Sequence, residues 1–511
     1  MAGIFRQNTE ITYDDKDLIE ENTFIGAEPD MTPLPKYEDI KNDLPQPVWD
    51  NHKDYLDCYW KAWEIAFGNL GMPTKENGFV SSYIDAAFNG CIFMWDSAFM
   101  LMFGKYADRI FKFQSTFDNF YAHQHVDGFI CRQIDEEDGK DIFARHDPAS
   151  TGPEVMAWCE WDYFLNFGDK ERLARVFPCL IAYHQWMQEH FTWRDGTYFS
   201  SGYGCGMDNC PRLDEKYHIC YSHGHMIWVD ACMQELNACN ILIKMSEVLG
   251  RDEFVPELVA ERDNLFKVIN EKLWDDKTKF YYDLRNDDTF NGVKHIGAFW
   301  SLLAKCVPED RSEDFIAHLN NENEFKTEHR VPTLSRDHEE YNPKGGYWCG
   351  SVWAPTNYMV LKGLDAYGKY ELSHEIACSH LKAVVSVFKD TDTLFENYAP
   401  EFFDGKAHRG SSSQPNFVGW TGLSPISIMF EYVFGIKPDA HNNKITWHVN
   451  LTDRHGIEKY PFGVNGELTL MCEAREDKNA EPEITVKSNI PVTVEVIWGE
   501  GEKKSKTILK K

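Results

Sequence analysis

The feature that most restricts the fold is a long succession of helical patterns. Apolar and aromatic residues recur every three or four positions in about twelve segments between residues 48 and 435. In the first segment, Tyr55, Tyr59, Trp63 and Phe67 fall on one helix face. Short connections alternate with long ones, so we expect six helical hairpins closed into an (α/α)6 toroid, with the long loops at one end. The expected helices cover residues 48–70, 90–105, 107–121, 154–167, 170–190, 225–249, 253–274, 291–305, 309–319, 351–367, 369–389 and 420–435.

The pattern changes after Pro438. Four segments beginning near residues 444, 466, 483 and 492 alternate apolar and polar residues, and turn residues separate them. We therefore expect a small C-terminal β-sandwich over residues 437–511, with a solvated basic tail, and a catalytic domain over residues 46–436. Residues 1–45 are acidic and rich in proline, which predicts an extended N-terminal arm on the surface.

Charge and composition exclude several classes of function. The chain carries 82 Asp and Glu against 52 Lys and Arg, a formal net charge of −30, and such a surface repels nucleic acid. Aromatic residues make up 14% of the chain, enough for both a bulky core and a pocket in which flat rings cover sugar faces. A small carbohydrate is thus the expected ligand, and the sequence makes no prediction of oligomeric state.

The remaining composition favours a soluble protein of a reducing compartment. The 14 cysteines lie in apolar, helical surroundings, as free core thiols do. The polar first residues predict no secretory signal, and no apolar run is long enough to cross a membrane. We therefore expect a cytoplasmic protein. Cys205 and Cys210 form a single C-x4-C pair without a matching pair, so we expect no metal and no cofactor.

Two loops each present one carboxylate. Asp208 lies within Gly204–Arg212, where glycines precede it and Pro211 follows, so a tight ordered loop is expected. Glu396 lies between aromatic residues and shortly before Pro400. Hydrolysis of a glycosidic bond needs two carboxyl groups, one to protonate the leaving oxygen and one to activate water or attack carbon. The alternative is that each acid is only a turn or cap residue.

A third acid lies near the start of a segment that is apolar almost all round. Trp95 and Asp96 precede this buried run, and a buried acid needs a partner. The partner is either a cap or buried hydrogen bond, or a ligand.

Together these stretches resemble glycoside hydrolase family 63 and the related mannosylglycerate-hydrolase-like enzymes, and more distantly trehalases. The similarity covers about residues 50–435 and rests on the order and spacing of the matching stretches. These are Met94–Ser97, Gly206–Arg212, Tyr347–Tyr358, Phe395–Tyr398 and Phe417–Thr421. Such enzymes have an (α/α)6 catalytic toroid and invert the configuration at the sugar.

The resemblance implies roles for individual residues. Asp208 is expected to be the general acid and Glu396 the general base. The resemblance further places these residues at the bound sugar: Trp95, Asp96, Arg132, Trp348, Trp353, Asn357 and Trp420. Where relatives often have arginine, this chain has Cys349, and the loop after Tyr398 also departs from the family pattern.

The favoured function is an exo-acting, inverting α-glucosidase for a small neutral α-glucoside. A glucosylglycerate, a mannosylglycerate or another α-mannoside is the first alternative, and a glycerate would need Arg132, Arg145 or Arg409 beside the aglycone. A disaccharide phosphorylase, with Arg409–Ser413 holding phosphate, and a non-catalytic sugar-binding protein also stay open.

Overall fold

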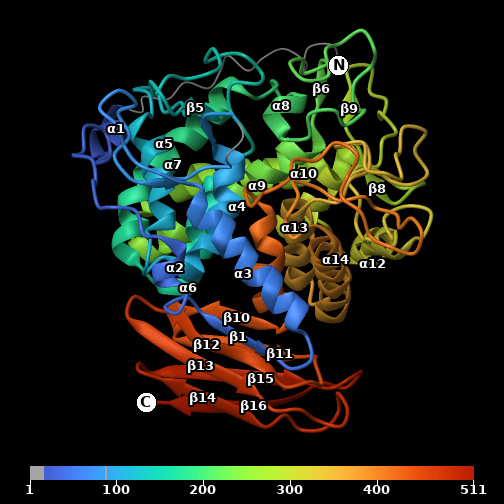
Figure 1. Cartoon of the computed structure of the whole chain (residues 1–511). Coiled ribbons are helices and arrows are strands. Elements are labelled where there is room, and N and C mark those ends of the chain that lie inside the picture. Colours follow the sequence, from blue (N-terminus) through green and yellow to red (C-terminus); the bar gives the residue numbers. More distant parts are fainter. Residues whose placement is uncertain (1–15, 87–88) are drawn as a thin grey trace.

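The computed structural model describes residues 16–86 and 89–511. Most helices gather in the upper part of the molecule in Figure 1, and the two largest sheets lie below them. The long connections of the helical part lie at the end far from the sheets. The described part of the chain holds no helix with the length and apolarity needed to cross a membrane. All fourteen cysteines are free thiols, as expected.

The predicted helices are present, and several are shorter than expected. They are α3 (Lys53–Gly68), α4 (Met94–Gly104), α5 (Thr116–Ala122), α6 (Met156–Phe167), α7 (Lys170–His190), α9 (Val229–Leu249), α10 (Val255–Val268), α11 (Trp300–Leu303), α12 (Glu309–Ala317), α13 (Ala354–Ala366), α14 (Tyr370–Thr391) and η8 (Ser424–Val433). The element η8 is a π-helix rather than an α-helix. Short helical turns are η1 (Lys105–Ala107), η2 (Phe113–Ser115), η3 (Asp252–Phe254), η4 (Ile269–Leu273), η5 (Ile296–Phe299), η6 (His318–Asn320), η7 (Thr421–Leu423) and η9 (Ala440–Asn442).

Six of these helical elements contact one another in a closed succession. Helix α4 packs on α6, α6 on α9, α9 on α11 and α11 on α13. Helix α13 packs on η8, and η8 packs back on α4. Helices α3, α5, α7, α10 and α14 each lie against one of the six. Because α4 has neighbours on every side, all eleven of its residues are buried, which explains its unbroken apolar sequence.

An ion network ties four of these elements together inside the core. Lys105 and Lys362 each contact both Asp162 and Glu431, at separations of 2.5 to 3.1 Å. Tyr358 donates a further hydrogen bond to Glu431. Two cations thus balance two carboxylates, which satisfies the charges that burial would otherwise leave uncompensated.

The C-terminal strands form two four-stranded sheets, in the orders β1-β12-β13-β14 and β10-β11-β15-β16. The four expected strands are β11 (Lys444–Val449), β13 (Gly466–Cys472), β14 (Ile484–Ser488) and β15 (Val492–Trp498). Three more are β10 (Ile436–Asp439), β12 (His455–Phe462) and β16 (Lys504–Lys510). The prediction of a solvated basic tail is wrong for β16, which pairs with β15 and is mostly exposed. Lysines on such an edge strand discourage pairing with other chains.

The N-terminal segment reaches these sheets. Strand β1 (Gln46–Trp49) pairs antiparallel with β12, so residues assigned to the start of the catalytic domain join the C-terminal sheet instead. The predicted extended arm contains the short helices α1 (Lys16–Glu21) and α2 (Tyr37–Ile40), and Phe24 and Leu44 are buried. Residues 1–15 of the predicted arm lie outside the described residues.

Smaller strand pairs brace the loops. They are β2 (Leu70–Gly71) with β3 (Tyr83–Ile84), β4 (Cys91–Phe93) with β5 (Gln133–Asp135), β6 (Met226–Ile227) with β9 (Leu284–Arg285), and β7 (Trp274–Asp275) with β8 (Phe280–Tyr281). Strand β4 explains why the predicted helix 90–105 begins only at Met94.

Candidate active site

A cavity of about 390 Å³ opens among the long loops. Its lining is largely aromatic, with several ionisable side chains between the rings. Seven of the nine predicted site residues line it: Trp95, Asp96, Arg132, Asp208, Trp348, Glu396 and Trp420. Residues that are 325 positions apart in the chain therefore meet at one site.

The cavity lies where several inner helices begin. Trp95 and Asp96 are in the first turn of α4, Pro153 precedes α6, and Trp420 precedes η7. The two candidate catalytic acids come from long loops, Asp208 after the short helix α8 (Gly202–Cys205) and Glu396 after α14. Rigid helices thus hold the walls, and ordered loops carry the acids.

The Asp208 loop depends on a glycine. Ser201 caps α8 by accepting a hydrogen bond from the backbone N–H of Gly204. Gly206 ends α8 with a φ of +73°, a conformation that residues with a Cβ rarely adopt. A Cβ at this position would also lie 3.3 Å from the Trp95 ring. Both constraints turn the chain so that Asp208 follows beside Trp95.

Asn209 joins this loop to the wall of the cavity. Its amide donates to the carbonyl of Gly346 at 3.1 Å and accepts from the backbone N–H of Trp348 at 2.8 Å. The residue next to Asp208 therefore fixes the position of Trp348.

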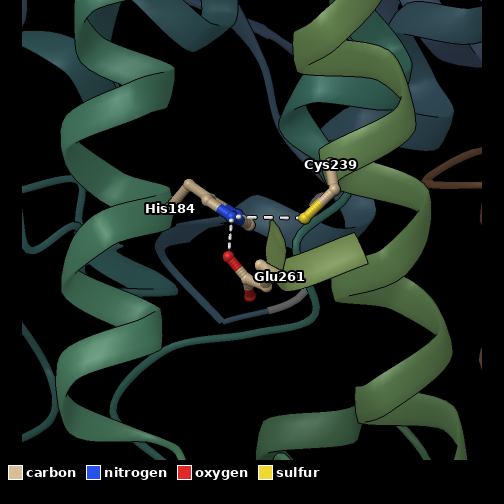
Figure 2. Close-up of side chains that lie close together, drawn as sticks. All are labelled: His184, Cys239 and Glu261. Atoms are coloured by element: carbon tan, nitrogen blue, oxygen red, sulfur yellow. Dashed lines mark hydrogen bonds and ion pairs between the residues drawn. The ribbon is translucent and has the colours of Figure 1, made fainter. Parts of the chain in front are cut away.

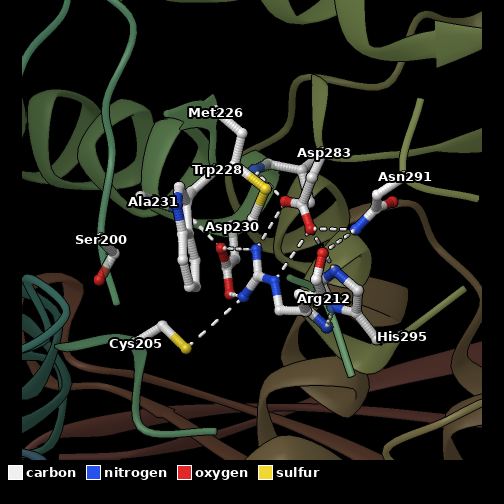
Figure 3. A network of polar contacts seen from close by, with 12 residues as sticks. Ser200, Cys205, Arg212, Met226, Trp228, Asp230, Ala231, Asp283, Asn291 and His295 are labelled. Atoms are coloured by element: carbon white, nitrogen blue, oxygen red, sulfur yellow. Dashed lines mark hydrogen bonds and ion pairs between the residues drawn. The ribbon is translucent and has the colours of Figure 1, made fainter. Parts of the chain in front are cut away.

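Arg212 anchors the end of the same loop in the core (Figure 3). Its guanidinium donates two hydrogen bonds to Asp230, at 2.6 and 2.7 Å, and two to Asp283, at 2.6 and 2.9 Å. It also lies over the Trp228 ring at 4.1 Å. Asn291 donates to Asp283 at 2.8 Å. The charge of Arg212 raises its own pKa through its partners and holds that of Asp283 well below the usual range despite burial.

Glu396 is buried and held at both oxygens. The Tyr347 hydroxyl donates to Oε1 at 3.1 Å, and the backbone N–H of Gln414 lies 3.3 Å from Oε2. Trp420 donates from its indole nitrogen to the backbone carbonyl of Glu396 at 2.7 Å. These contacts leave the carboxylate little freedom to rotate.

Asp96 and Trp95 have polar atoms to spare. Asp96 Oδ1 and Trp95 Nε1 are buried and find no hydrogen-bond partner among the described residues. Burial raises the pKa of Asp96 well above its usual value, and the charge of Glu396 adds to the rise. An acceptor and a donor beside each other in a cavity are suited to the hydroxyl groups of a sugar.

Arg132 brings a positive charge to the cavity. Its Nε donates to the carbonyl of Ala149 at 2.7 Å, and its guanidinium lies over the rings of Phe143 and Tyr203. Burial lowers the pKa of Arg132, and the charge of Asp208 opposes this effect. Arg145 instead pairs with Asp127 at 3.0 Å.

Both candidate catalytic acids have raised pKa values. Burial raises the pKa of Asp208 to about 6, against the opposing charge of Arg132. Burial raises the pKa of Glu396 to about 7, which the hydrogen bonds from Gln414 and Tyr347 oppose and the charge of Asp208 assists. Each group can therefore exist with or without its proton near neutral pH.

Two predicted substrate contacts lie behind the wall instead. Trp353 is fully buried and stacks on Trp348, with ring centroids 4.0 Å apart and planes 4° from parallel. Asn357 is buried in α13, where its amide donates to the carbonyls of Val331 and Trp353. The helix turns these side chains into the core, so both support Trp348 rather than reach the cavity.

Other lining residues were not predicted, although the sequence contains them in or near the matching stretches. Tyr347, which precedes Trp348, is the most important because it holds Glu396. Its aromatic neighbours in the matching stretch hid it, since a tyrosine there reads as one more wall residue. The further lining residues are Asn89, Phe93, Gln133, Ile142, Phe143, Gly152, Pro153, Tyr203 and Gly206.

A family model for the mannosylglycerate hydrolase MGH1-like glycoside hydrolase domain matches residues 92–414, which is more than half of the chain. The chain belongs to this family of glycoside hydrolases. The matched range contains the loops of both candidate acids and all of the cavity lining except Asn89 and Trp420.

Curated relatives with this domain act on different glycosides. A mannosylglycerate hydrolase from Thermus thermophilus is 23% identical over 386 residues, covering 62% of this chain and 91% of the relative. A probable mannosyl-oligosaccharide glucosidase from Schizosaccharomyces pombe is 22% identical over 296 residues, covering 51% of this chain. The match spans only 34% of the length of that glucosidase.

The Thermus thermophilus enzyme also resembles this chain in three dimensions. The crystal structure of its GH63 mannosylglycerate hydrolase with glucose superposes with a TM-score of 0.58 at 19% identity. It covers 72% of this chain and 99% of that structure. Similarity at this level of identity establishes a shared fold.

Proposed function

We propose that this glycoside hydrolase removes a terminal hexose from a small α-linked glycoside, with inversion at the anomeric carbon. The observation that carries the proposal is the meeting of Asp208 and Glu396 at one aromatic-walled cavity. In this reaction Asp208 protonates the leaving oxygen, and Glu396 takes a proton from the attacking water. Inversion requires their carboxyl groups to stand about 6.5–9.5 Å apart, which leaves room for that water.

The remaining lining residues bind the sugar in this proposal. Asp96 Oδ1 and Trp95 Nε1 supply an acceptor and a donor for its hydroxyls, since neither has a partner among the described residues. Trp348 and Trp420 cover apolar faces of the ring and exclude water, which strengthens the electrostatic interactions inside.

The proposed scaffold is an (α/α)6 toroid over residues 46–436 with a C-terminal β-sandwich over residues 437–511. The closed succession of α4, α6, α9, α11, α13 and η8 supports the toroid. Two four-stranded sheets support the sandwich, to which β1 adds a strand from the N-terminal side.

The test is release of free sugar from a panel of α-linked glucosides and mannosides. We expect release of glucose from a neutral α-glucosyl disaccharide without added phosphate. Proton NMR at early times should show the β-anomer first, because inversion of an α-linkage yields it. Initial release of the α-anomer would contradict inversion, and turnover only with phosphate would identify a phosphorylase. Tight sugar binding without turnover would identify a binding protein.

A second candidate substrate is a glycerate conjugate of glucose or mannose. It is favoured by Arg132, whose guanidinium lies at the cavity close enough to Asp208 for their charges to interact. A cation beside the general acid is well placed for a carboxylate on the leaving group. Arg409 lies elsewhere, where it is exposed and hydrogen-bonded to the carbonyl of Ser413.

Arg132→Gln separates the two candidates. If the aglycone is a glycerate, the variant should lower kcat/KM for glucosylglycerate about 10- to 150-fold, as loss of a hydrogen bond to a charged group costs about 1.5–3 kcal/mol. Glucosylglycerol, which lacks the carboxylate, serves as the matched neutral substrate and should change only a few-fold. An equal loss on both substrates would assign Arg132 to the cavity wall alone.

The pKa values of the acids predict a narrow pH optimum. Activity needs Glu396 ionised, so kcat/KM should rise with pH as the base loses its proton. It also needs Asp208 protonated, so activity should fall as the acid loses its proton. With pKa values of about 6 and 7, the profile should be bell-shaped with a maximum between them.

The height of this bell reports where the single proton resides. Because Glu396 has the higher pKa, the form with the proton on Asp208 is the minor one in the free protein, which lowers the maximum without moving it. The measurement is kcat/KM from pH 4.5 to 9 at constant ionic strength. A flat profile across pH 5–8 would exclude both carboxyls as the titrating pair.

A further inference from the structure

Three helices bring a histidine, a cysteine and a glutamate together outside the cavity (Figure 2). His184 lies in α7, Cys239 in α9 and Glu261 in α10, and all three side chains are buried. His184 Nε2 is 3.6 Å from Cys239 Sγ and 3.0 Å from Glu261 Oε2. One ligand atom from each residue lies within 4.8 Å of the others.

These separations approach those of a tetrahedral zinc site. Zinc bonds of about 2.0–2.1 Å to nitrogen, 2.3 Å to sulfur and 2.0–2.2 Å to oxygen place nitrogen about 3.6 Å from sulfur and about 3.3 Å from oxygen. The observed 3.6 Å matches the first value, and a shift of a few tenths of an ångström would meet the second. Imidazole, thiolate and carboxylate are also the ligand types that zinc prefers.

Surrounding groups are arranged as the outer shell of a metal site. His184 Nδ1 lies 2.7 Å from Glu154 Oε2, so the carboxylate can hold the ring with Nε2 directed at a metal. Tyr198 donates its hydroxyl to the other oxygen of Glu261. Glu154 Oε1 and Glu235 Oε2 are buried and find no hydrogen-bond partner among the described residues, so the region carries more negative charge than its hydrogen bonds account for.

A fourth position is accessible from outside. A notch of about 10 Å³ beside His184 and Glu261 is also lined by Ile181, Gln185, Gln188, Phe254, Glu257 and Leu258. Such a volume is near the minimum that one water molecule needs. A sugar could not enter, so any bound metal would stabilise the helices rather than act on the substrate.

We propose that His184, Cys239 and Glu261 bind one zinc ion, with Glu154 orienting the histidine and water as the fourth ligand. Binding releases the thiol proton of Cys239 and any proton on His184 Nε2 to solvent, since both ligands bind zinc deprotonated. The competing account is a protonated His184 that bridges Glu154 and Glu261 without metal. The ligands lie 55 and 22 residues apart on separate helices, so no sequence spacing indicates the site.

The test compares zinc binding by the whole wild-type protein and by Cys239→Ser. After removal of metal with a chelator, each protein is titrated with zinc chloride against a competing chromophoric chelator, and zinc is counted by mass spectrometry after gel filtration. The wild type should retain one zinc per chain, and its melting temperature should rise. The control is Cys232→Ser, which removes another buried thiol seven residues earlier on α9 and should behave like the wild type.

Two further measurements separate a ligand from a merely structural thiol. Glu154→Gln should weaken zinc binding about 10- to 100-fold, as loss of an outer-shell carboxylate does. Cobalt(II) should give a near-ultraviolet thiolate-to-metal absorption band in the wild type and in Cys232→Ser, but not in Cys239→Ser. Equal zinc retention by Cys239→Ser and the wild type, or no retained zinc in the wild type, would overturn the proposal in favour of the metal-free ion pair.

Discussion

Replacing Glu396 by glutamine is expected to lower kcat by about 10²–10⁴, the range that general acid–base catalysis contributes. Glutamine keeps the size of the side chain but cannot accept a proton from water. The contacts from Tyr347 and Gln414 hold a side chain of this shape, so the fold should survive. The measurement is release of sugar from the best substrate of the panel, with circular dichroism and the melting temperature of the variant recorded alongside.

The matching change in Asp208 distinguishes acid from base. Asp208→Asn should lose activity on an ordinary glycoside but retain much of it on an α-glycosyl fluoride, because fluoride leaves without protonation. Glu396→Gln should stay inactive on both. Glu401→Gln alters a loop carboxylate five residues after Glu396 that pairs with Arg336, and should change kcat less than about twofold. Full activity of Glu396→Gln would remove the assigned base.

Loss of Arg212 is expected to have the largest effect on stability. Arg212→Met would leave Asp230 and Asp283 buried without their shared cation, which costs about 3–5 kcal/mol when one partner of a buried pair is removed. A domain has only about 5–15 kcal/mol of stability in total. The variant should therefore accumulate poorly, and its urea midpoint should fall sharply where it can be purified.

A conservative change keeps this prediction testable if Arg212→Met does not fold. Arg212→Lys retains the charge but cannot make the paired hydrogen bonds to both aspartates, so an intermediate loss of stability is expected. Its kcat should also fall, since Arg212 ends the loop that carries Asp208. Arg262→Met, which breaks an exposed pair with Asp263, should cost at most about 1 kcal/mol. An equal effect of Arg212→Met and Arg262→Met would contradict the anchoring role.

Local sequence patterns determined the order of the helices and most of the strands. Helical periodicity and alternation are properties of adjacent residues, so the segments around Tyr59 in α3 and Val494 in β15 were recognisable without knowledge of their partners. Glycine, proline and aromatic residues around Asp208 and Glu396 likewise marked two loops with a single acid each. The similarity to a known family then supplied their expected roles.

Only the tertiary structure decided which of those residues share a site and what surrounds them. The pairing of β1 with β12 joins residues about 400 positions apart, and no local pattern specifies such a pairing. Trp353 and Trp348 read alike in the sequence, yet one lies behind the other because the start of α13 turns its side chains into the core. The raised pKa values of Asp208 and Glu396, the four hydrogen bonds of Arg212 and the cluster around His184 depend in the same way on burial and charge from distant segments. Burial and electrostatic interaction are set by distance in space, and a sequence pattern records only distance along the chain.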